Sequence, residues 1–151
     1  MEKKIVIFDT NIWLYYVQRR QELVDIIEQH KLTVFASDYL KQEIRSVFSR
    51  PHLNRFMEGE SFESYFENYF EVITTTVSPE SLFTRCPDKN DNFLYDLARQ
   101  SQAQFIITED RRLWHFTHRL EGLKVLGMAK FLKKYTAPTV LPMFFFCLIC
   151  I

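Results

Sequence analysis

The sequence predicts an α/β domain, a three-layer α/β/α sandwich built around a mostly parallel sheet. Short apolar runs alternate along the chain with segments whose apolar residues recur at helical spacing, and this alternation is typical of parallel sheets. The first run, residues 4–8, is apolar without alternation, as in a strand that is buried on both faces. Acidic residues follow two of the runs, at the positions where such strands would end.

The first half of the chain predicts two strands and two long helices. Residues 4–8 form the first strand, and Thr10 or Asn11 can cap a helix whose apolar positions are only roughly periodic through Ile27. Residues 32–36 form the next strand. Ser37 then caps a helix in which the apolar residues recur at helical spacing; these residues are Leu40, Ile44, Val47 and Phe48.

The second half predicts shorter elements separated by polar turns. In chain order they are helical stretches near 53–57 and 62–70, a strand over 71–77, a turn over 86–90, a helix opening at Asp91, a strand over 104–108, a strand over 124–126 and a short helix over 129–133.

Domain organisation is predicted as one domain over residues 1–137, followed by an atypical hydrophobic tail over 138–151. The tail is too short for a spanning helix, which needs roughly 20 residues. It is interpreted as a non-native extension, a docking segment for a partner or second copy, or a weak membrane contact. No membrane span is predicted.

Composition limits the function without deciding it. Nineteen basic residues balance nineteen acidic ones, so indiscriminate binding to polyanions is disfavoured while a local basic patch is allowed. The three cysteines do not make a disulfide framework, and the charged N-terminal residues lead directly into a strand, so a cytoplasmic location is predicted. Cys147 and Cys150 lack the second Cys/His pair of a zinc site.

Four carboxylates form the candidate site: Asp9, Glu43, Asp91 and Asp110. Asp9 and Asp110 end two strands, and if these strands are parallel neighbours, both side chains reach the crevice at the carboxyl ends of the sheet. Clustered carboxylates repel one another, and a cluster that persists usually holds a hard cation such as Mg²⁺ or Mn²⁺. Each acid taken alone is weak evidence, because Asp9, Asp91 and Asp110 could simply cap the helix or turn that follows and Glu43 alone is more often a solvated helix residue.

These acids lie in segments that resemble the PIN-domain (PilT N-terminus) ribonucleases. The resembling segments are residues 8–11 (Phe-Asp-Thr-Asn), 40–47 (Leu-Lys-Gln-Glu-Ile-Arg-Ser-Val), 87–94 (Pro-Asp-Lys-Asn-Asp-Asn-Phe-Leu), 106–110 (Ile-Ile-Thr-Glu-Asp), 123–126 (Leu-Lys-Val-Leu) and 131–132 (Phe-Leu). The resemblance covers about residues 3–135 in the family's order and excludes the tail. Two departures are Glu109, where the family commonly has glycine, and the pair Cys86-Pro87.

The resemblance implies a nuclease that hydrolyses RNA phosphodiester bonds, of the kind used as the toxin of a toxin–antitoxin pair. Its cofactor would be Mg²⁺ or Mn²⁺, held by Asp9, Asp91 and Asp110 with Glu43 orienting a water. RNA would be the substrate, an antitoxin protein the partner, and a homodimer is allowed. Asn11 and Thr108 would orient the carboxylates by hydrogen bonds.

Substrate contact needs cations and stacking faces near the acids. The predicted RNA-binding residues are Arg45, Arg85, Lys89 and Arg111, with Arg50 and Arg112 as further cations and Trp13, Tyr16 and Trp114 as aromatic platforms. His115 and His118 are predicted to be ordinary surface residues.

Two other functions fit parts of the sequence. A phosphatase could use Asp9 as a nucleophile, but the second Asp of the common D-x-D signature and a Gly-rich phosphate loop are both missing. A PIN-like module could instead bind RNA or a partner without cleavage, although all four acids are present.

Overall fold

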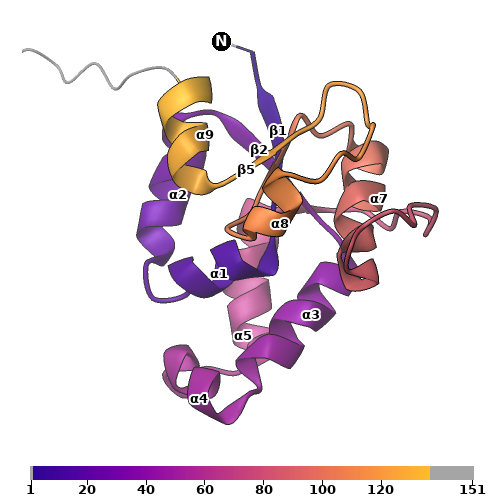
Figure 1. Ribbon diagram of the computed structural model, residues 1–151. Helices are drawn as coiled ribbons and strands as arrows, with labels where there is room; N and C mark the ends of the chain where they lie inside the picture. Colours follow the sequence, from indigo (N-terminus) through magenta and orange to yellow (C-terminus); the bar gives the residue numbers. More distant parts are fainter. Residues whose placement is uncertain (1, 137–151) are drawn as a thin grey trace, which may run out of the picture.

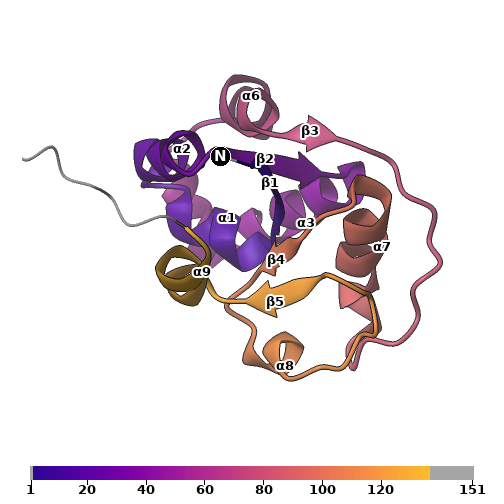
Figure 2. The same cartoon turned by 90° about the horizontal axis from the view of Figure 1, so that it is seen from above.

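The computed structural model describes residues 2–136, so the predicted tail and its two cysteines lie outside the described residues. The described chain forms a five-stranded sheet in which every pairing is parallel, in the order β3-β2-β1-β4-β5 (Figure 2). The strands are β1 (Lys4–Phe8), β2 (Leu32–Ala36), β3 (Thr75–Thr76), β4 (Phe105–Ile107) and β5 (Lys124–Leu126).

Helices connect these strands and surround the sheet (Figure 1). They are α1 (Thr10–Tyr16), α2 (Arg20–Gln29), α3 (Asp38–Phe48), α4 (Pro51–Asn54), the 3₁₀ turn η1 (Arg55–Met57), α5 (Phe62–Tyr65), the π-helical turn η2 (Phe66–Phe70), α6 (Glu71–Ile73), the 3₁₀ turn η3 (Lys89–Asp91), α7 (Asn92–Ser101), α8 (Arg111–Trp114) and α9 (Met128–Tyr135).

Two apolar cores lie on opposite faces of the sheet, which confirms the predicted three-layer α/β/α sandwich. Because side chains alternate along a strand, Val6 and Phe8 enter one core while Ile7 enters the other. The first core packs against α1, α2, α3, η2 and α9, and the second packs against α7 and α8. Both faces of β1 are therefore buried, as its continuous apolar run predicts.

The strand order places a reversal between β1 and β4. The chain proceeds from β1 outward through β2 to β3, then returns to the other side of β1 as β4. Phe8 is opposite Ile107 in this parallel pair, and the Asp9 backbone N–H donates to the Ile107 carbonyl at 3.0 Å. The carboxyl ends of these two strands thus flank the crevice where open α/β sheets bind ligands.

The predicted long helix after Asp9 is wrong, because two helices replace it. Helix α1 ends at Tyr16 and α2 begins at Arg20. The Arg20 Nε–H donates to the Val17 carbonyl at 3.0 Å, and the guanidinium forms an ion pair with Glu60. This side-chain bond satisfies a carbonyl at the end of α1, and so closes the helix. Glu60 lies 40 residues from Arg20 in sequence, so the spacing of apolar residues near α1 cannot predict this ion pair.

The predicted strand over 71–77 is also largely wrong. Residues 71–73 continue the preceding helical segment as α6, and only Thr75–Thr76 pair with β2. The Thr74 hydroxyl donates to the Phe70 carbonyl at 2.8 Å, which satisfies a carbonyl at the end of the helical segment. The β-branched residues here therefore form a short edge strand after a helix rather than a full strand.

Candidate functional site

Asp9 begins the site at the carboxyl end of β1. Its side chain is buried, with 7% of the residue exposed. One carboxylate oxygen accepts the Thr10 backbone N–H at 2.7 Å and so caps α1, while the other accepts the Thr108 hydroxyl at 2.7 Å. Burial raises the pKa of Asp9, and these hydrogen bonds oppose that shift. The carboxylate is thus held in one orientation by elements that are 99 residues apart.

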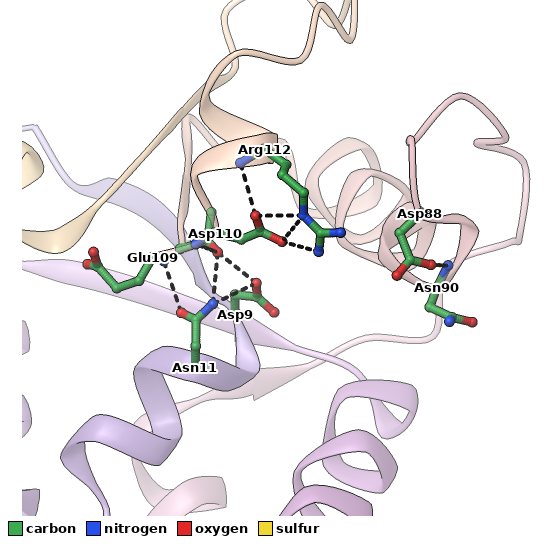
Figure 3. A network of polar contacts seen from close by, with 8 residues as sticks. Asp9, Asn11, Asp88, Asn90, Glu109, Asp110 and Arg112 are labelled. Atoms are coloured by element: carbon green, nitrogen blue, oxygen red, sulfur yellow. Dashed lines mark hydrogen bonds and ion pairs between the residues drawn. The ribbon is translucent and has the colours of Figure 1, made fainter.

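Asn11 and Thr108 connect the ends of β1 and β4 (Figure 3). The Asn11 amide donates to Asp9 at 3.3 Å and to the Thr108 oxygen at 3.1 Å. Its carbonyl oxygen accepts the Glu109 backbone N–H at 3.0 Å. The Thr108 oxygen also accepts the Asp110 N–H at 3.1 Å, so one network fixes both strand exits.

Glu43 reaches the same region from α3. Its carboxylate accepts a hydrogen bond from the Thr10 hydroxyl, the residue directly after Asp9. The side chain is half-buried, and burial is the largest cause of its raised pKa. The negative charges of Asp9 and Asp88 raise the pKa further, so Glu43 lies within electrostatic range of these acids.

Asp91 contributes a carboxylate without a fixed partner. It ends η3 directly before α7, but its side chain makes no capping hydrogen bond and no ion pair within residues 2–136. Burial raises its pKa to about 6, with further contributions from Asp9, Asp88, Asp110 and Glu43. All four predicted acids therefore interact electrostatically across β1, α3, η3 and the β4 exit.

Asp110 differs from the other three because Arg112 already neutralises it. Both carboxylate oxygens accept hydrogen bonds from the guanidinium, at 2.7–3.2 Å, and one also accepts the Arg112 backbone N–H at 2.9 Å (Figure 3). This pairing lowers the pKa of Asp110. The charges of Asp91 and Asp88 also favour the charged guanidinium, so Arg112 lies in the field of several acids.

The donor set fits a hard divalent cation, since every one of these side chains offers carboxylate oxygen. A cation would also relieve the repulsion that raises the pKa of Asp91. In the conformation described for residues 2–136, however, no three acidic, histidine or cysteine side chains converge closely enough to hold an ion. The guanidinium of Arg112 occupies both oxygens of Asp110 instead.

Asp88 is a member of the acidic group that sequence reasoning did not select. Its side chain accepts the Asn90 N–H at 2.9 Å, and its charge raises the pKa of both Glu43 and Asp91. Figure 3 shows it on the loop across from Arg112. The sequence contains one signal for it, because Asp88 lies three residues before Asp91 in the same turn.

The predicted RNA-binding cations have different surroundings. Arg85 and Lys89 are exposed and make no ion pair within the described residues. Arg45 instead pairs with Glu63 at 3.1 Å and lies over the ring of Phe62. Arg111 lies over the Trp114 ring at 5.9 Å. Its neighbour Arg112 is the cation that the structure brings to the acids.

Two of the predicted aromatic platforms are wrong. Trp13 and Tyr16 are core residues, with 1% and 5% exposed. Trp13 donates its indole N–H to the Phe8 carbonyl at 3.1 Å. Trp114 is half-buried and donates its own indole N–H to the Thr108 carbonyl at 2.7 Å, so it braces the end of β4.

The histidines near the end of α8 also differ from each other. His115 is exposed, as predicted. His118 is half-buried rather than a plain surface residue: its Nδ1 accepts the Leu120 N–H at 3.0 Å, and burial lowers its pKa. Within residues 2–136, neither imidazole forms a hydrogen bond or an ion pair with the four acids, so neither belongs to the acidic group.

Glu109, the departure from the family pattern, points away from the acids (Figure 3). One of its carboxylate oxygens accepts the Met128 N–H at 2.9 Å, at the start of α9. Gly127 lies against this side chain: a Cβ there would lie 3.1 Å from a Glu109 carboxylate oxygen and 2.8 Å from the Trp114 ring. The additional carboxylate thus caps a helix and does not enlarge the acidic site.

Comparisons with known proteins agree with this arrangement. A sequence model of the PIN domain matches residues 5–112, a range that contains all four predicted acids and Arg112. The chain is also 24% identical over 124 residues to a protein from Methanocaldococcus jannaschii, and the aligned region covers 80% of this chain and 79% of that protein. That relative bears the name "Uncharacterized protein MJ1680". None of the helices within residues 2–136 is long and apolar enough to cross a membrane.

Proposed function

Because this chain belongs to the PIN-domain family, we propose that it is a metal-dependent ribonuclease that hydrolyses RNA phosphodiester bonds. The observation that carries the proposal is the mutual interaction of four acids at the β1–β4 reversal. Burial and the charges of the neighbouring acids raise the pKa of Asp91 to about 6, so its ionised form is unfavourable without a cation. Such a site stabilises a bound divalent ion.

Asp9, Asp91 and Asp110 are the residues that would hold Mg²⁺ or Mn²⁺, and Glu43 would orient a water. When bound, the ion activates water and neutralises charge on the phosphate. Asn11 and Thr108 fix the orientation of Asp9 through the hydrogen bonds described above. Burial raises the pKa of Glu43, which makes its carboxylate a better proton acceptor for a water at its exposed edge.

RNA contact is assigned to the exposed cations around the acids. Arg85 and Lys89 border the turn that carries Asp91, and Arg111 and Arg112 follow Asp110 directly. Phosphate contacts by arginine and lysine position a nucleic acid without reading its sequence. Arg45 is the weakest of these assignments, because Glu63 already holds it.

The biological role proposed for this activity is that of a toxin neutralised by an antitoxin protein, with RNA in the cytoplasm as the target. The resemblance of the acidic segments supports this role. A homodimer is compatible with it. Growth arrest on expression of the chain, relieved by co-expression of a neighbouring reading frame, is the result that this role predicts.

The test of the enzymatic proposal is cleavage of a labelled RNA by the purified protein. We expect cleavage with Mg²⁺ or Mn²⁺, none in excess EDTA, and none with Asp9→Asn, which keeps the side-chain shape but removes a charge. Asp25→Asn is the matched control, because Asp25 is exposed on α2 and its carboxylate accepts a hydrogen bond from Gln21 rather than from a residue of the site. Undiminished cleavage in EDTA would contradict the metal-dependent mechanism.

One observation favours a second function, a PIN-like module that binds RNA or a partner without cleaving it. Arg112 neutralises Asp110, and no three acids converge to hold an ion within the described chain. If this function is correct, the protein binds RNA but cleaves none with any divalent metal, and Asp9→Asn leaves binding unchanged.

A further inference from the structure

We propose that the groove between α3 and η3, the elements that carry Glu43 and Asp91, is a subsite for one unpaired nucleobase of an RNA strand, with Tyr39 as its stacking face. The inference rests on the proposed ribonuclease function and deepens it, because it names the groove and the side chain that hold one base of the substrate. Unpaired bases in RNA are commonly recognised by stacking on aromatic side chains.

The position of the groove is the first argument. It has a volume of about 390 Å³ and lies between the start of α3 and the segment over residues 78–93. Its walls include Tyr39 from α3 and Lys89 and Asn90 from η3. These two elements also carry Glu43 and Asp91. Tyr39 precedes Glu43 by four residues, so both side chains lie on the same face of the helix.

The second argument is the state of the Tyr39 ring. It is 50% exposed, but it packs against Phe93 with 4.6 Å between ring centroids and an interplanar angle of 41°. Phe93 therefore supports the ring on one side while half of the residue stays open to solvent. A supported aromatic ring loses little entropy when a base stacks on it, and such stacking is worth about 1–3 kcal/mol per base.

The third argument is the distribution of polar groups around the groove. Lys89 is exposed and has no ion pair within the described residues, so it can contact a phosphate. Asp38 also lines the groove, and its exposed carboxylate would repel a phosphate but could accept a hydrogen bond from a base. The Asn90 amide makes no hydrogen bond in the described part of the chain and can pair with a base edge. The groove therefore fits a base, with its phosphate outside.

A second exposed tyrosine provides a matched control. Tyr15 is 55% exposed, but the Arg19 guanidinium lies 4.5 Å from its ring centroid and Tyr16 packs edge-on against it. Its ring is therefore already in contact with a cation and a second aromatic ring. Replacing Tyr15 with alanine removes an exposed aromatic surface similar to that of Tyr39, and Tyr15 does not line the groove.

The experiment measures binding separately from cleavage. An Asp9→Asn background prevents cleavage in Mg²⁺, and fluorescence anisotropy gives Kd for a labelled single-stranded RNA and for the same sequence as a duplex. We expect Tyr39→Ala to raise Kd for the single strand about tenfold, and Tyr39→Phe and Tyr15→Ala to change it less than about twofold. Duplex binding changes less than about twofold in every variant, because paired bases cannot enter the groove.

Equal losses for Tyr39→Ala and Tyr15→Ala, or equal losses for single strand and duplex, would overturn the subsite. So would an absence of single-strand binding by the parent protein. Thermal melting of each variant checks the fold. If Tyr39→Ala unfolds, Tyr39→Leu replaces it, because leucine keeps an apolar contact with Phe93 but has no ring for a base to stack on. Intact, Tyr39-dependent binding by a wild-type chain that cleaves no RNA would instead contradict only the ribonuclease proposal.

Discussion

At the scale of single residues, two of the four acids also have an ordinary structural role. Asp9 and Asp110 cap α1 and α8, as an aspartate after a strand commonly does. Asp91 departs from this pattern, since its side chain does not cap α7 and burial with four neighbouring charges raises its pKa. The sequence predicts the four acids, but it does not predict that Arg112 rather than Arg111 reaches them, because that depends on side-chain direction.

Asp91→Asn should stabilise the protein at pH 7 in the absence of metal. The pKa of Asp91 is raised to about 6 in the folded state, above that of an unfolded aspartate, so the folded state binds the proton more tightly. In the wild-type protein, the stabilisation that comes from protonated Asp91 is therefore present at low pH and is lost as the pH rises through about 6. Thermal melting should show a higher Tm for the variant at pH 7, and the difference should shrink towards pH 4.

Arg112→Gln should tighten the binding of Mn²⁺ while weakening the binding of RNA. Removal of the guanidinium frees both oxygens of Asp110, and we expect Kd for Mn²⁺ to fall about three- to tenfold, as the loss of a competing surface ion pair allows. Calorimetry with Mn²⁺ alone measures this. Arg111→Gln is the control, because Arg111 contacts Trp114 instead of an acid. Weaker Mn²⁺ binding by Arg112→Gln would show that the arginine supports the metal site.

At the scale of elements, local sequence accounts for the strands that carry the site but not for every connection. The predicted strands at 4–8, 32–36 and 124–126 have those bounds, and β4 is shorter than predicted by one residue at each end. Each of these strands contributes apolar residues to both cores, so local pattern suffices even though Lys124 is exposed. The break between α1 and α2 depends on the ion pair between Arg20 and Glu60. The predicted strand over 71–77 is mostly not formed, because residues 71–73 continue the helical segment before them.

Glu109→Gly, which introduces the residue common in the family, should destabilise the fold without weakening metal binding. The Glu109 carboxylate caps α9 through the Met128 N–H and points away from the acids. Loss of a side-chain cap costs about 0.5–2 kcal/mol. Urea unfolding measures this cost, and Glu109→Gln should recover part of it because its amide oxygen can still accept the bond. A large loss of Mn²⁺ affinity in either variant would instead place Glu109 in the site.

At the scale of the whole molecule, the sheet order explains why distant segments meet. Asp9 and Asp110 are about 100 residues apart in sequence, yet β1 and β4 are parallel neighbours at the reversal of strand order. The alternation of strands and helices predicts a parallel sheet, and the three-layer fold is confirmed. The distance between the four carboxylates is not readable from sequence, since it depends on how α3 and η3 pack against the sheet.

Deletion of residues 138–151 should leave the fold and the nuclease activity intact. This segment lies outside the described residues, and the last described helix, α9, ends at Tyr135. Its apolar sequence predicts association, so the shortened chain should be more soluble. Circular dichroism, RNA cleavage and light scattering measure the three properties. Loss of folding would show that the segment belongs to the core and that the domain boundary at residue 137 is wrong.

The location of a bound Mn²⁺ ion tests the account most directly, because every proposed role of the four acids depends on it. The measurement is a crystal structure of the protein grown with Mn²⁺, with the ion identified by anomalous scattering. We predict an ion between Asp9, Asp91 and Asp110 at oxygen distances of about 2.0–2.6 Å, with the Arg112 guanidinium turned away from Asp110. An ion bound elsewhere, or an Arg112–Asp110 pair that persists at saturating Mn²⁺ with no ion at the acids, would contradict the account.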